Sequence, residues 1–173
     1  MDELKRNENF MNNGLHKLFL DELADIYHAE RQMVKTLPKL AQSAEHENLR
    51  EAFASHLRET ENHVSRIEQV FASLGEPARR KKCRGMAGVI DEGKQTLDDN
   101  KGSEALDAAL IAVAQKAEHY EIASYGCLCT WADLMGHQEA LRLLQENLAE
   151  EKQADERLTE IAKSTANVEA QHD

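Results

Sequence analysis

The sequence predicts an all-α protein with one domain and four long helices, and three observations support this fold class. Residues of high helix propensity dominate the composition, and only 2 prolines and 8 glycines interrupt them. Aromatic residues make up only 5% of the chain, and runs of β-branched residues, which favour strands, are scarce. Apolar residues recur at i, i+3, i+4 and i+7 in several long stretches, as they do on the buried face of a helix.

The first helix is predicted to run from Leu15 to about residue 44. Residues 1–14 before it are mostly polar and charged, and we expect them to form a disordered tail. Glu30 occupies a position on this helix that the apolar pattern would otherwise give to a hydrophobic residue. Pro38 lies inside the helix, where we expect a kink or a break because proline cannot donate a backbone hydrogen bond.

The second helix is predicted to begin at Asn48 and to continue for about 26 residues. Asn48 and Glu51, three residues apart, resemble a capping box, and Gly75 and Pro77 end the helix. Three polar residues lie along the edge of its apolar stripe, and these are His56, Glu59 and His63.

A long connection follows, and its section Met86–Leu97 is predicted to form a shorter helix. The third long helix spans Ala105–Leu134, with Ser103 as its N-cap residue. This segment is apolar enough to lie at the centre of a bundle. Glu118 and Glu121 nevertheless lie one turn apart on its buried face.

The fourth helix is predicted to span residues 137–163, after a tight turn at Gly136. Its apolar stripe again contains acids, Glu151 and Asp155. We expect residues 164–173 to form a frayed tail.

The lengths of the connections predict how the four helices are arranged. The long crossover allows the third helix to run parallel to the second, so residues 15–163 form two antiparallel helix pairs. This order is that of a ferritin-like four-helix bundle, here with a short extra helix in the crossover. An internal repeat of about 91 residues, which aligns Glu30 with Glu121, supports this pairing.

Seven polar side chains near the helix midpoints are predicted to meet at one level inside the bundle. They are Glu30, Glu59, His63, Glu118, Glu121, Glu151 and Asp155. Burial of one unpaired charged side chain costs on the order of several kcal/mol, whereas the free energy of unfolding of a whole domain is only ~5–15 kcal/mol. No inward row of Arg or Lys neutralises these acids, so they are partly protonated or they bind divalent cations. Oxygen-rich donors with an imidazole favour two iron or manganese ions, which carboxylates bridge at about 3.5–4 Å.

The charge and the cysteine content argue against several classes of protein. The chain has 21 basic and 32 acidic residues, a net charge of −11, so we expect no nucleic-acid partner. The basic run at residues 79–84 is interpreted as a solvated loop. No apolar run approaches the ~20 residues of a membrane span, and the polar start does not resemble a signal peptide. The three cysteines are interpreted as reduced thiols, which are typical of the cytosol. We therefore expect a cytoplasmic protein that has no membrane partner.

Four segments, in the same order, carry a resemblance to a known family. They are LFLDELADIYHAERQMVKTLPKLAQSAEHENLREAF, HLRETENHVSRIEQVFASLGEP, CRGMAGVIDEG and AEHYEIASYGCLCTWADLMGH. Over about residues 15–163 the chain resembles the YciE/YciF family of bacterial ferritin-like proteins. The resemblance implies a ferritin-like bundle, a homodimer, a di-metal centre and a link to the stress response.

The wider ferritin-like pattern has a Glu on the first and third helices and Glu-x-x-His on the second and fourth. The residues that match it are Glu30, Glu121, His63 and Glu151. The second helix departs from it, because Thr60 stands where Glu is expected and Glu59 lies one residue earlier. The fourth departs too, because Ala154 replaces His and Asp155 lies one residue later. Glu118 is an extra acid that would restore the number of carboxylates.

The other histidines and the tyrosines receive simpler interpretations. His56 is close enough to the predicted site to support a ligand without binding metal itself. His28 and His119 lie two residues before their Glu neighbours, on other helix faces, and are interpreted as surface or interface groups. The tyrosines are interpreted as core residues.

Two functional hypotheses follow from the sequence. The first is an oxidoreductase with two iron or manganese ions that acts on peroxide or dioxygen, either ferroxidase-like or manganese-catalase-like. The second is a non-catalytic helical stress protein that acts by association, with a structural or vestigial metal site, and the broken Glu-x-x-His motifs favour it. Storage in a hollow cage ranks third, because nothing in the sequence predicts a shell.

Overall fold

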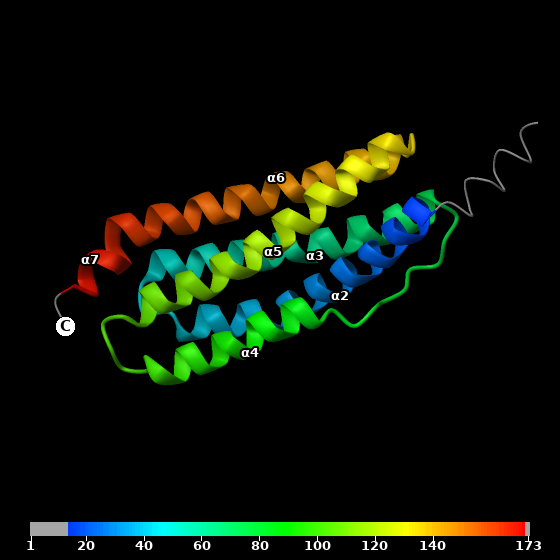
Figure 1. Cartoon of the computed structure of the whole chain (residues 1–173). Helices are drawn as coiled ribbons and strands as arrows, with labels where there is room; N and C mark the ends of the chain where they lie inside the picture. Colours follow the sequence, from blue (N-terminus) through cyan, green and yellow to red (C-terminus); the bar gives the residue numbers. More distant parts are fainter. Residues whose placement is uncertain (1–13, 172–173) are drawn as a thin grey trace, which may run out of the picture.

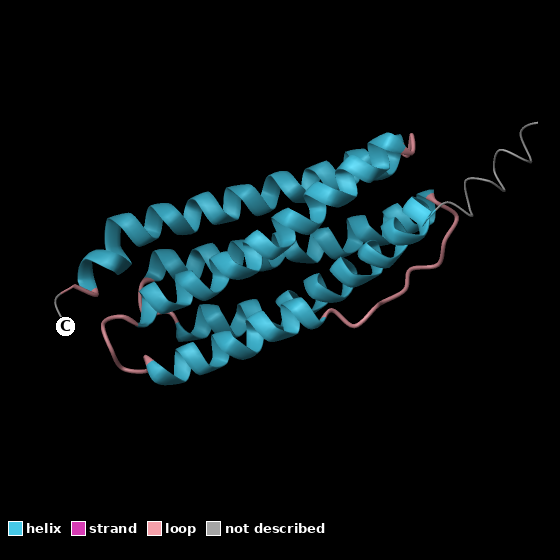
Figure 2. Ribbon diagram, viewed as in Figure 1, coloured by secondary structure: helices cyan, strands magenta, loops and turns pink. Residues whose placement is uncertain are grey.

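The computed structural model describes residues 14–171 and shows a bundle of helices, with no strand in this part of the chain (Figure 2). Four long helices form the bundle, and they are α2 (Gly14–Ser43), α3 (Glu47–Ser73), α5 (Leu106–Leu134) and α6 (Gln138–Ile161). A further helix, α4 (Arg84–Asp99), lies in the connection between α3 and α5. The predicted all-α fold with a crossover helix is confirmed. Of the tail predicted at residues 1–14, residues 1–13 lie outside the described residues and Gly14 begins α2.

The helix directions agree with the predicted order of the bundle. The α2–α3 pair and the α5–α6 pair are each antiparallel, whereas α3 and α5 run in the same direction (Figure 1). The chain between α3 and α5 returns along the length of the bundle, and α4 packs beside α5 and α2 on the way (Figure 1). None of the described helices is both long enough and apolar enough to cross a membrane.

The core follows buried seams whose members are alternately four and three residues apart. The seam of α3 consists of Leu49, Phe53, His56, Thr60, His63, Ile67 and Val70. The seam of α6 consists of Ala140, Leu144, Asn147, Glu151, Ala154, Leu158 and Ile161. This alternation keeps one edge of each helix against its neighbours, as in coiled coils and four-helix bundles. Apolar residues fill both ends of each seam, and polar residues occupy the middle.

The start of α3 differs from the sequence prediction. α3 begins at Glu47 after His46, so Asn48 is not its cap. The physical reason is tertiary, because the carboxylate of Asp107 on α5 accepts the backbone N–H groups of Glu45 and His46 at 2.9 and 2.8 Å. This buried carboxylate therefore replaces the predicted capping box.

The start of α5 and the end of the chain also differ from expectation. Ala105, not Ser103, is the N-cap residue of α5, and Ser103 Oγ accepts the backbone N–H of Ala105 at 3.0 Å.

α2 continues through the exposed Pro38 to Ser43 without a break. Helical structure also continues past residue 163, as a π-helical turn (Ala162–Ala166) and α7 (Asn167–Glu169). Burial of Ala166 against the core explains why this segment is ordered.

Candidate metal centre

Four glutamates from three helices are completely buried in the middle of the bundle. They are Glu30 on α2, Glu118 and Glu121 on α5, and Glu151 on α6, each with 0% exposure. The remaining long helix, α3, contributes two imidazoles, because His56 and His63 are 4% and 0% exposed. Carboxylates are almost never fully buried unless they are paired or bound to a metal, so this cluster is a candidate metal site.

The six side chains form two overlapping groups with the spacing of metal ligands. His56, Glu118, Glu121 and Glu151 form the first group, and each offers one ligand atom within 4.8 Å of the others. Glu30, His63 and Glu151 form the second group by the same criterion. Glu151 belongs to both groups.

Each imidazole has one nitrogen directed at the buried carboxylates and one that binds an outer acid. His56 Nε2 lies 3.1 Å from Glu118 Oε1, and its Nδ1 lies 3.1 Å from Glu59 Oε2. His63 Nδ1 lies 2.9 Å from Glu151 Oε1, and its Nε2 lies 2.8 Å from Glu150 Oε2. A carboxylate on the outer nitrogen fixes the ring and makes the inner nitrogen a better metal ligand.

A second layer of polar residues fixes the outer acids and Glu30. Arg66 donates to both oxygens of Glu150, at 2.7 and 2.9 Å. Tyr125 donates its hydroxyl to Glu30 Oε1 and accepts the side-chain amide of Asn147 at 3.0 Å. Tyr125 and Asn147 are both 0% exposed, so this layer is rigid on both sides of the centre.

Most of the inner ligand atoms form no hydrogen bond among the described residues and lie close to one another instead. Both oxygens of Glu118, Glu121 and Glu151 are in this state. So are Glu30 Oε2, His56 Nε2 and His63 Nδ1. Orphaned buried acceptors are costly, at about 1–3 kcal/mol each, unless an ion or water satisfies them. The donor set therefore fits divalent cations, which such oxygen and nitrogen atoms bind.

In the absence of a metal, the surroundings of the two buried histidines favour their charged forms. Burial opposes the charged form of His63, but Glu30 and Glu150 outweigh this effect and raise its pKa to about 10. Burial likewise opposes the charge on His56, and the Glu118 carboxylate raises the pKa of His56 well above its ordinary value. The charge on His56 in turn lowers the pKa of Glu118, although burial acts in the opposite direction.

The pKa values of Glu121 and Glu151 shift in the opposite direction to that of Glu118. Burial raises the pKa of Glu121 well above its ordinary value, and the neighbouring carboxylates of Glu30 and Glu151 raise it further. Burial and the Glu118 carboxylate raise the pKa of Glu151 in the same way. Without metal, these shifts favour protons on the two carboxyls and on the two imidazoles, which limits the negative charge of the centre.

Five of the seven residues predicted from the sequence lie in these two groups. They are Glu30, His63, Glu118, Glu121 and Glu151. The other two lie outside: Glu59 contacts the outer nitrogen of His56 and Arg157, and Asp155 contacts Gln115 and His119. His56 replaces them as an inner residue, although the sequence analysis gave it only a supporting role.

A clear signal for His56 was present in the sequence. His56, Thr60 and His63 are separated by four and three residues, which is the seam spacing, whereas Glu59 falls between seam positions. Thr60 is buried and donates its hydroxyl to the backbone carbonyl of His56 at 2.8 Å. Residues at other positions therefore replace the ligands that the two Glu-x-x-His motifs lack. The two groups together contain four Glu and two His, which is the number in the ferritin-like pattern.

Comparison with known proteins identifies the family of this chain. Residues 14–171 match the family model described as a domain of unknown function (DUF892). The chain is 43% identical to protein YciF of Escherichia coli K12 over 159 residues, which cover 91% of this chain and 96% of YciF. A protein of Xanthomonas campestris has a TM-score of 0.71 at 20% identity over 92% of this chain and 98% of its own, which shows the fold alone.

Two solved structures are similar in both sequence and fold. The crystal structure of the E. coli stress protein YciF has a TM-score of 0.85 at 43% identity, over 90% of this chain and 98% of that chain. YcfI of Rhodopseudomonas palustris has a TM-score of 0.83 at 41% identity, over 85% and 94% of the two chains. The resemblance noted in the sequence is thereby confirmed, and the chain belongs to the YciF family of helical proteins.

Proposed function

We propose that the six buried side chains hold two divalent ions, iron or manganese, and that this centre reacts with peroxide or dioxygen. One observation carries the proposal: four fully buried glutamates converge with two imidazoles, and most of their inner atoms form no hydrogen bond among the described residues. Paired iron or manganese ions supply redox steps that protein side chains cannot.

The charges of the ligands support two ions better than one. Four carboxylates carry four negative charges, which two divalent ions balance when both imidazoles are neutral. Metal binding requires deprotonated ligands, so the protons held by His56, His63, Glu121 and Glu151 are released on loading. Glu59 and Glu150 remain in place to hold the two rings in the ligating orientation.

The space beside the centre favours a small substrate. A pocket lined by Phe53, His56, Glu118, Arg157 and other residues reaches the inner group, and its volume is only about 10 Å³. A space of that size admits about one water-sized molecule. Peroxide and dioxygen are of this size, whereas a larger organic substrate would need the helices to separate.

The decisive experiment measures metal content. The protein is purified without chelator, and bound iron, manganese and zinc are determined for the wild type and for Glu30→Ala/Glu121→Ala. We expect about two iron or manganese ions per wild-type chain and a large loss in the double variant. Asp155→Asn/Glu156→Gln is the matched control, and it should keep the metal because Asp155 lies outside the inner groups and Glu156 is exposed. A wild type that stays folded and empty after reconstitution would refute the metal centre.

The loaded protein then separates the reactions. Iron loading followed by oxygen consumption tests ferroxidase activity, and oxygen release from peroxide tests the manganese-catalase-like reaction. A loaded protein that performs neither would support the second candidate, a non-catalytic stress protein with structural ions. The relatives favour that candidate, because E. coli YciF is a stress protein and R. palustris YcfI has been considered a structural protein.

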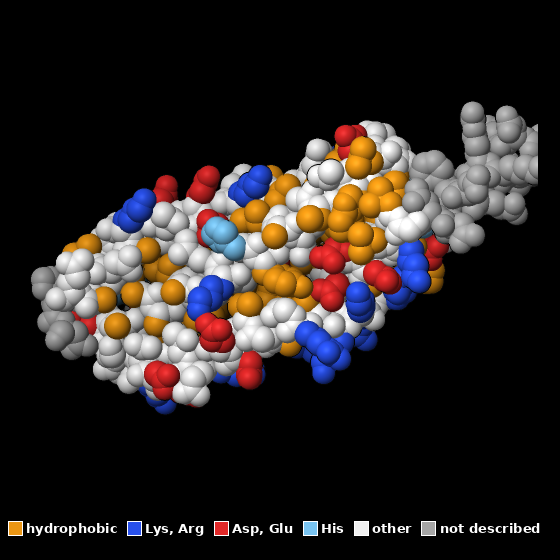
Figure 3. All heavy atoms as spheres, viewed as in Figure 1, with side chains coloured by type: hydrophobic (Ala, Val, Ile, Leu, Met, Phe, Trp, Pro, Cys, Tyr) orange, Lys and Arg blue, Asp and Glu red, His pale blue; other side chains and the backbone are white. Residues whose placement is uncertain are grey.

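We also propose a homodimer, and an apolar surface supports it. Hydrophobic side chains gather on the face in Figure 3 at the end of the bundle where α2 begins and α5 ends. Leu18, near the start of α2, and Leu134, at the end of α5, are 48% and 71% exposed. A contiguous exposed apolar patch is typical of an interaction surface. Sedimentation of the wild type and of Leu18→Gln/Leu134→Gln would test it, and a wild-type monomer at all concentrations would refute it.

A further inference from the structure

An apolar groove lies between α2, α4 and α5, and the proposed metal centre does not use it. Its volume is about 240 Å³. Its walls are made by Met33 and Leu40 from α2, Ile90 and Leu97 from α4, and Ala114 and Ala117 from α5. Ligand sites are typically concave, predominantly apolar and edged by a few polar groups.

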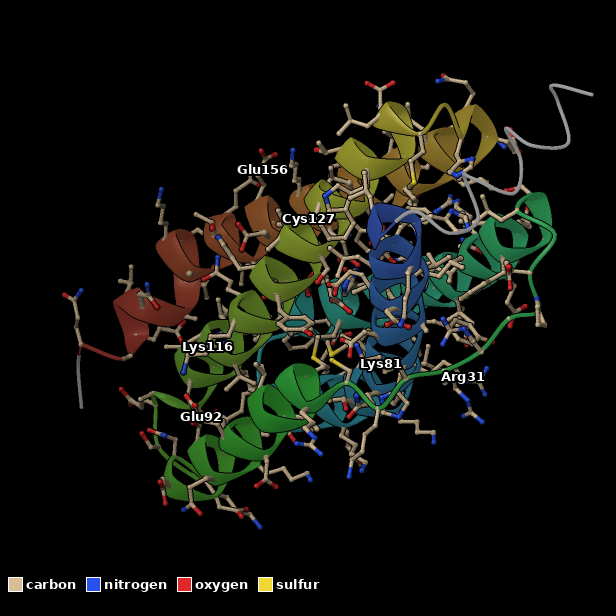
Figure 4. All side chains as sticks on the ribbon, turned by 45° about the vertical axis from the view of Figure 1, so that its right-hand side comes forward. Arg31, Lys81, Glu92, Lys116, Cys127 and Glu156 are labelled. Carbon is tan, nitrogen blue, oxygen red and sulfur yellow. The ribbon has the colours of Figure 1, made fainter. Side chains whose placement is uncertain are left out.

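The groove exists because α4 is fixed close to α5. A Cβ atom on Gly93 would lie only 2.6 Å from Val113 Cγ1, so glycine allows the two helices to touch there. On the surface, an ion pair between Lys116 of α5 and Glu92 of α4 also joins these two helices (Figure 4). The small side chains of Ala114 and Ala117 then leave space between these helices and α2.

The charge at the groove is opposite to that of the whole chain. Three lysines line it, Lys35 and Lys39 on α2 and Lys94 on α4, and no Asp or Glu is among its lining residues. The chain as a whole has a net charge of −11. In the described part of the chain Lys35 and Lys39 form no ion pair, and Lys94 has only an exposed pair with Asp91 at 3.7 Å. Like charges one helical turn apart repel each other, so an anion between these lysines would be stabilising.

We propose that this groove binds a single alkyl chain with an acidic head group, that is, a medium-chain fatty acid. The alkyl chain lies against the apolar walls, and the carboxylate lies at the edge between the lysines of α2 and α4. Apolar burial supplies the affinity, and the three ammonium groups supply the preference for an anionic head.

The test compares three ligands that share a ten-carbon chain and differ in their head groups. Decanoate, decanol and decyltrimethylammonium are titrated into the full-length protein below their micelle concentrations and followed by calorimetry. We expect saturable one-to-one binding of decanoate, weaker binding of decanol and no binding of the cation. Equal binding of decanoate and the cation, or no binding of decanoate, would overturn the proposal.

Matched variants locate the site. Lys35→Gln/Lys39→Gln/Lys94→Gln should weaken decanoate binding by about tenfold or more and leave decanol binding unchanged. Lys17→Gln/Lys101→Gln/Lys163→Gln removes the same charge from exposed positions outside the groove and should leave both unchanged. Equal weakening by the two triple variants would show that net charge, not the groove, binds the anion. Sedimentation of the groove variant provides a further check, because a change in its mass would assign the groove to a second copy of the chain and overturn the proposal.

Discussion

The two helix pairs, α2–α3 and α5–α6, share their seams but not their polar residues. A shift of about 91 residues places the whole α3 seam, from Leu49 to Val70, on the α6 seam, from Ala140 to Ile161. The same shift places Glu30 on Glu121. The backbone of the bundle therefore has an approximate two-fold repeat, as the sequence predicted.

The polar residues in the middle of the seams break this repeat. The shift places His56 on Asn147, Thr60 on Glu151 and His63 on Ala154. The first pair thus contributes both imidazoles and one carboxylate, and the second contributes three carboxylates. A bundle adds ligands from all four helices at one level, so a symmetric scaffold can hold a complete ligand set that is not symmetric.

The largest expected effect is the loss of an imidazole from the first pair. In metal-free protein, His63→Leu leaves the buried carboxylate of Glu30 without this positive neighbour, which should cost about 3–5 kcal/mol of stability. Urea unfolding at pH 7 measures it. His119→Leu is the control at a 67% exposed position, and it should change stability by less than about 0.5 kcal/mol. Similar values for the two variants would show that the inner histidine is not charged.

The pH dependence of the metal-free protein follows from the same imidazole. The pKa of His63 is raised to about 10, so its contribution to stability is complete below its unfolded value and is lost as the pH rises to about 10. Glu121 and Glu151, whose pKa values are also raised, act in the same direction. Stability should therefore fall above about pH 6.5, by up to about 1.4 kcal/mol per pH unit for each proton. A flat profile, or an equal slope in His63→Leu, would contradict this assignment.

A smaller effect is expected when the two pairs are made more alike. Thr60→Glu gives α3 the glutamate that α6 has at Glu151 and completes a Glu-x-x-His motif with His63. In metal-free protein the new carboxyl takes up a proton and remains poorly bonded, at a cost of about 1–3 kcal/mol. Thr60→Val, which removes only the bond to the His56 carbonyl, should cost about 1 kcal/mol. Urea unfolding compares the variants, and a Thr60→Glu protein as stable as the wild type would show that the centre has room for a fifth acid.

The smallest effect is expected at Glu59, which the sequence analysis placed among the metal ligands and the structure places outside the two inner groups. Glu59→Gln removes the carboxylate that contacts the outer nitrogen of His56 and its partly buried pair with Arg157. Stability should change by less than about 1 kcal/mol. Metal affinity should fall by about tenfold, as for other residues that orient a ligand. Glu118→Gln, on the inner side of the same ring, should lose metal far more strongly. Equal losses in a metal titration would place Glu59 among the ligands.

The sequence predicted the helices and the polar middle of the bundle because both are local properties of periodicity. Glu30, Glu118, Glu121 and Glu151 were identified since each is an acid at a position where helical spacing requires an apolar residue. Helix ends were predicted less well. The cap of α3 depends on Asp107, which lies about 60 residues away in sequence and in another helix.

By itself, the sequence determined the fold class, the antiparallel pairs, the family and most residues of the candidate metal centre. The seam spacing in the sequence favours His56 over Glu59, but only the tertiary structure decided which residues at the edge of each stripe face inward. His56 lies inside and Glu59 and Asp155 lie outside because each helix is rotated until its apolar seam ends pack against its neighbours. The groove between α2, α4 and α5 is also a tertiary property, since the close contact of Gly93 with Val113 sets the distance between helices.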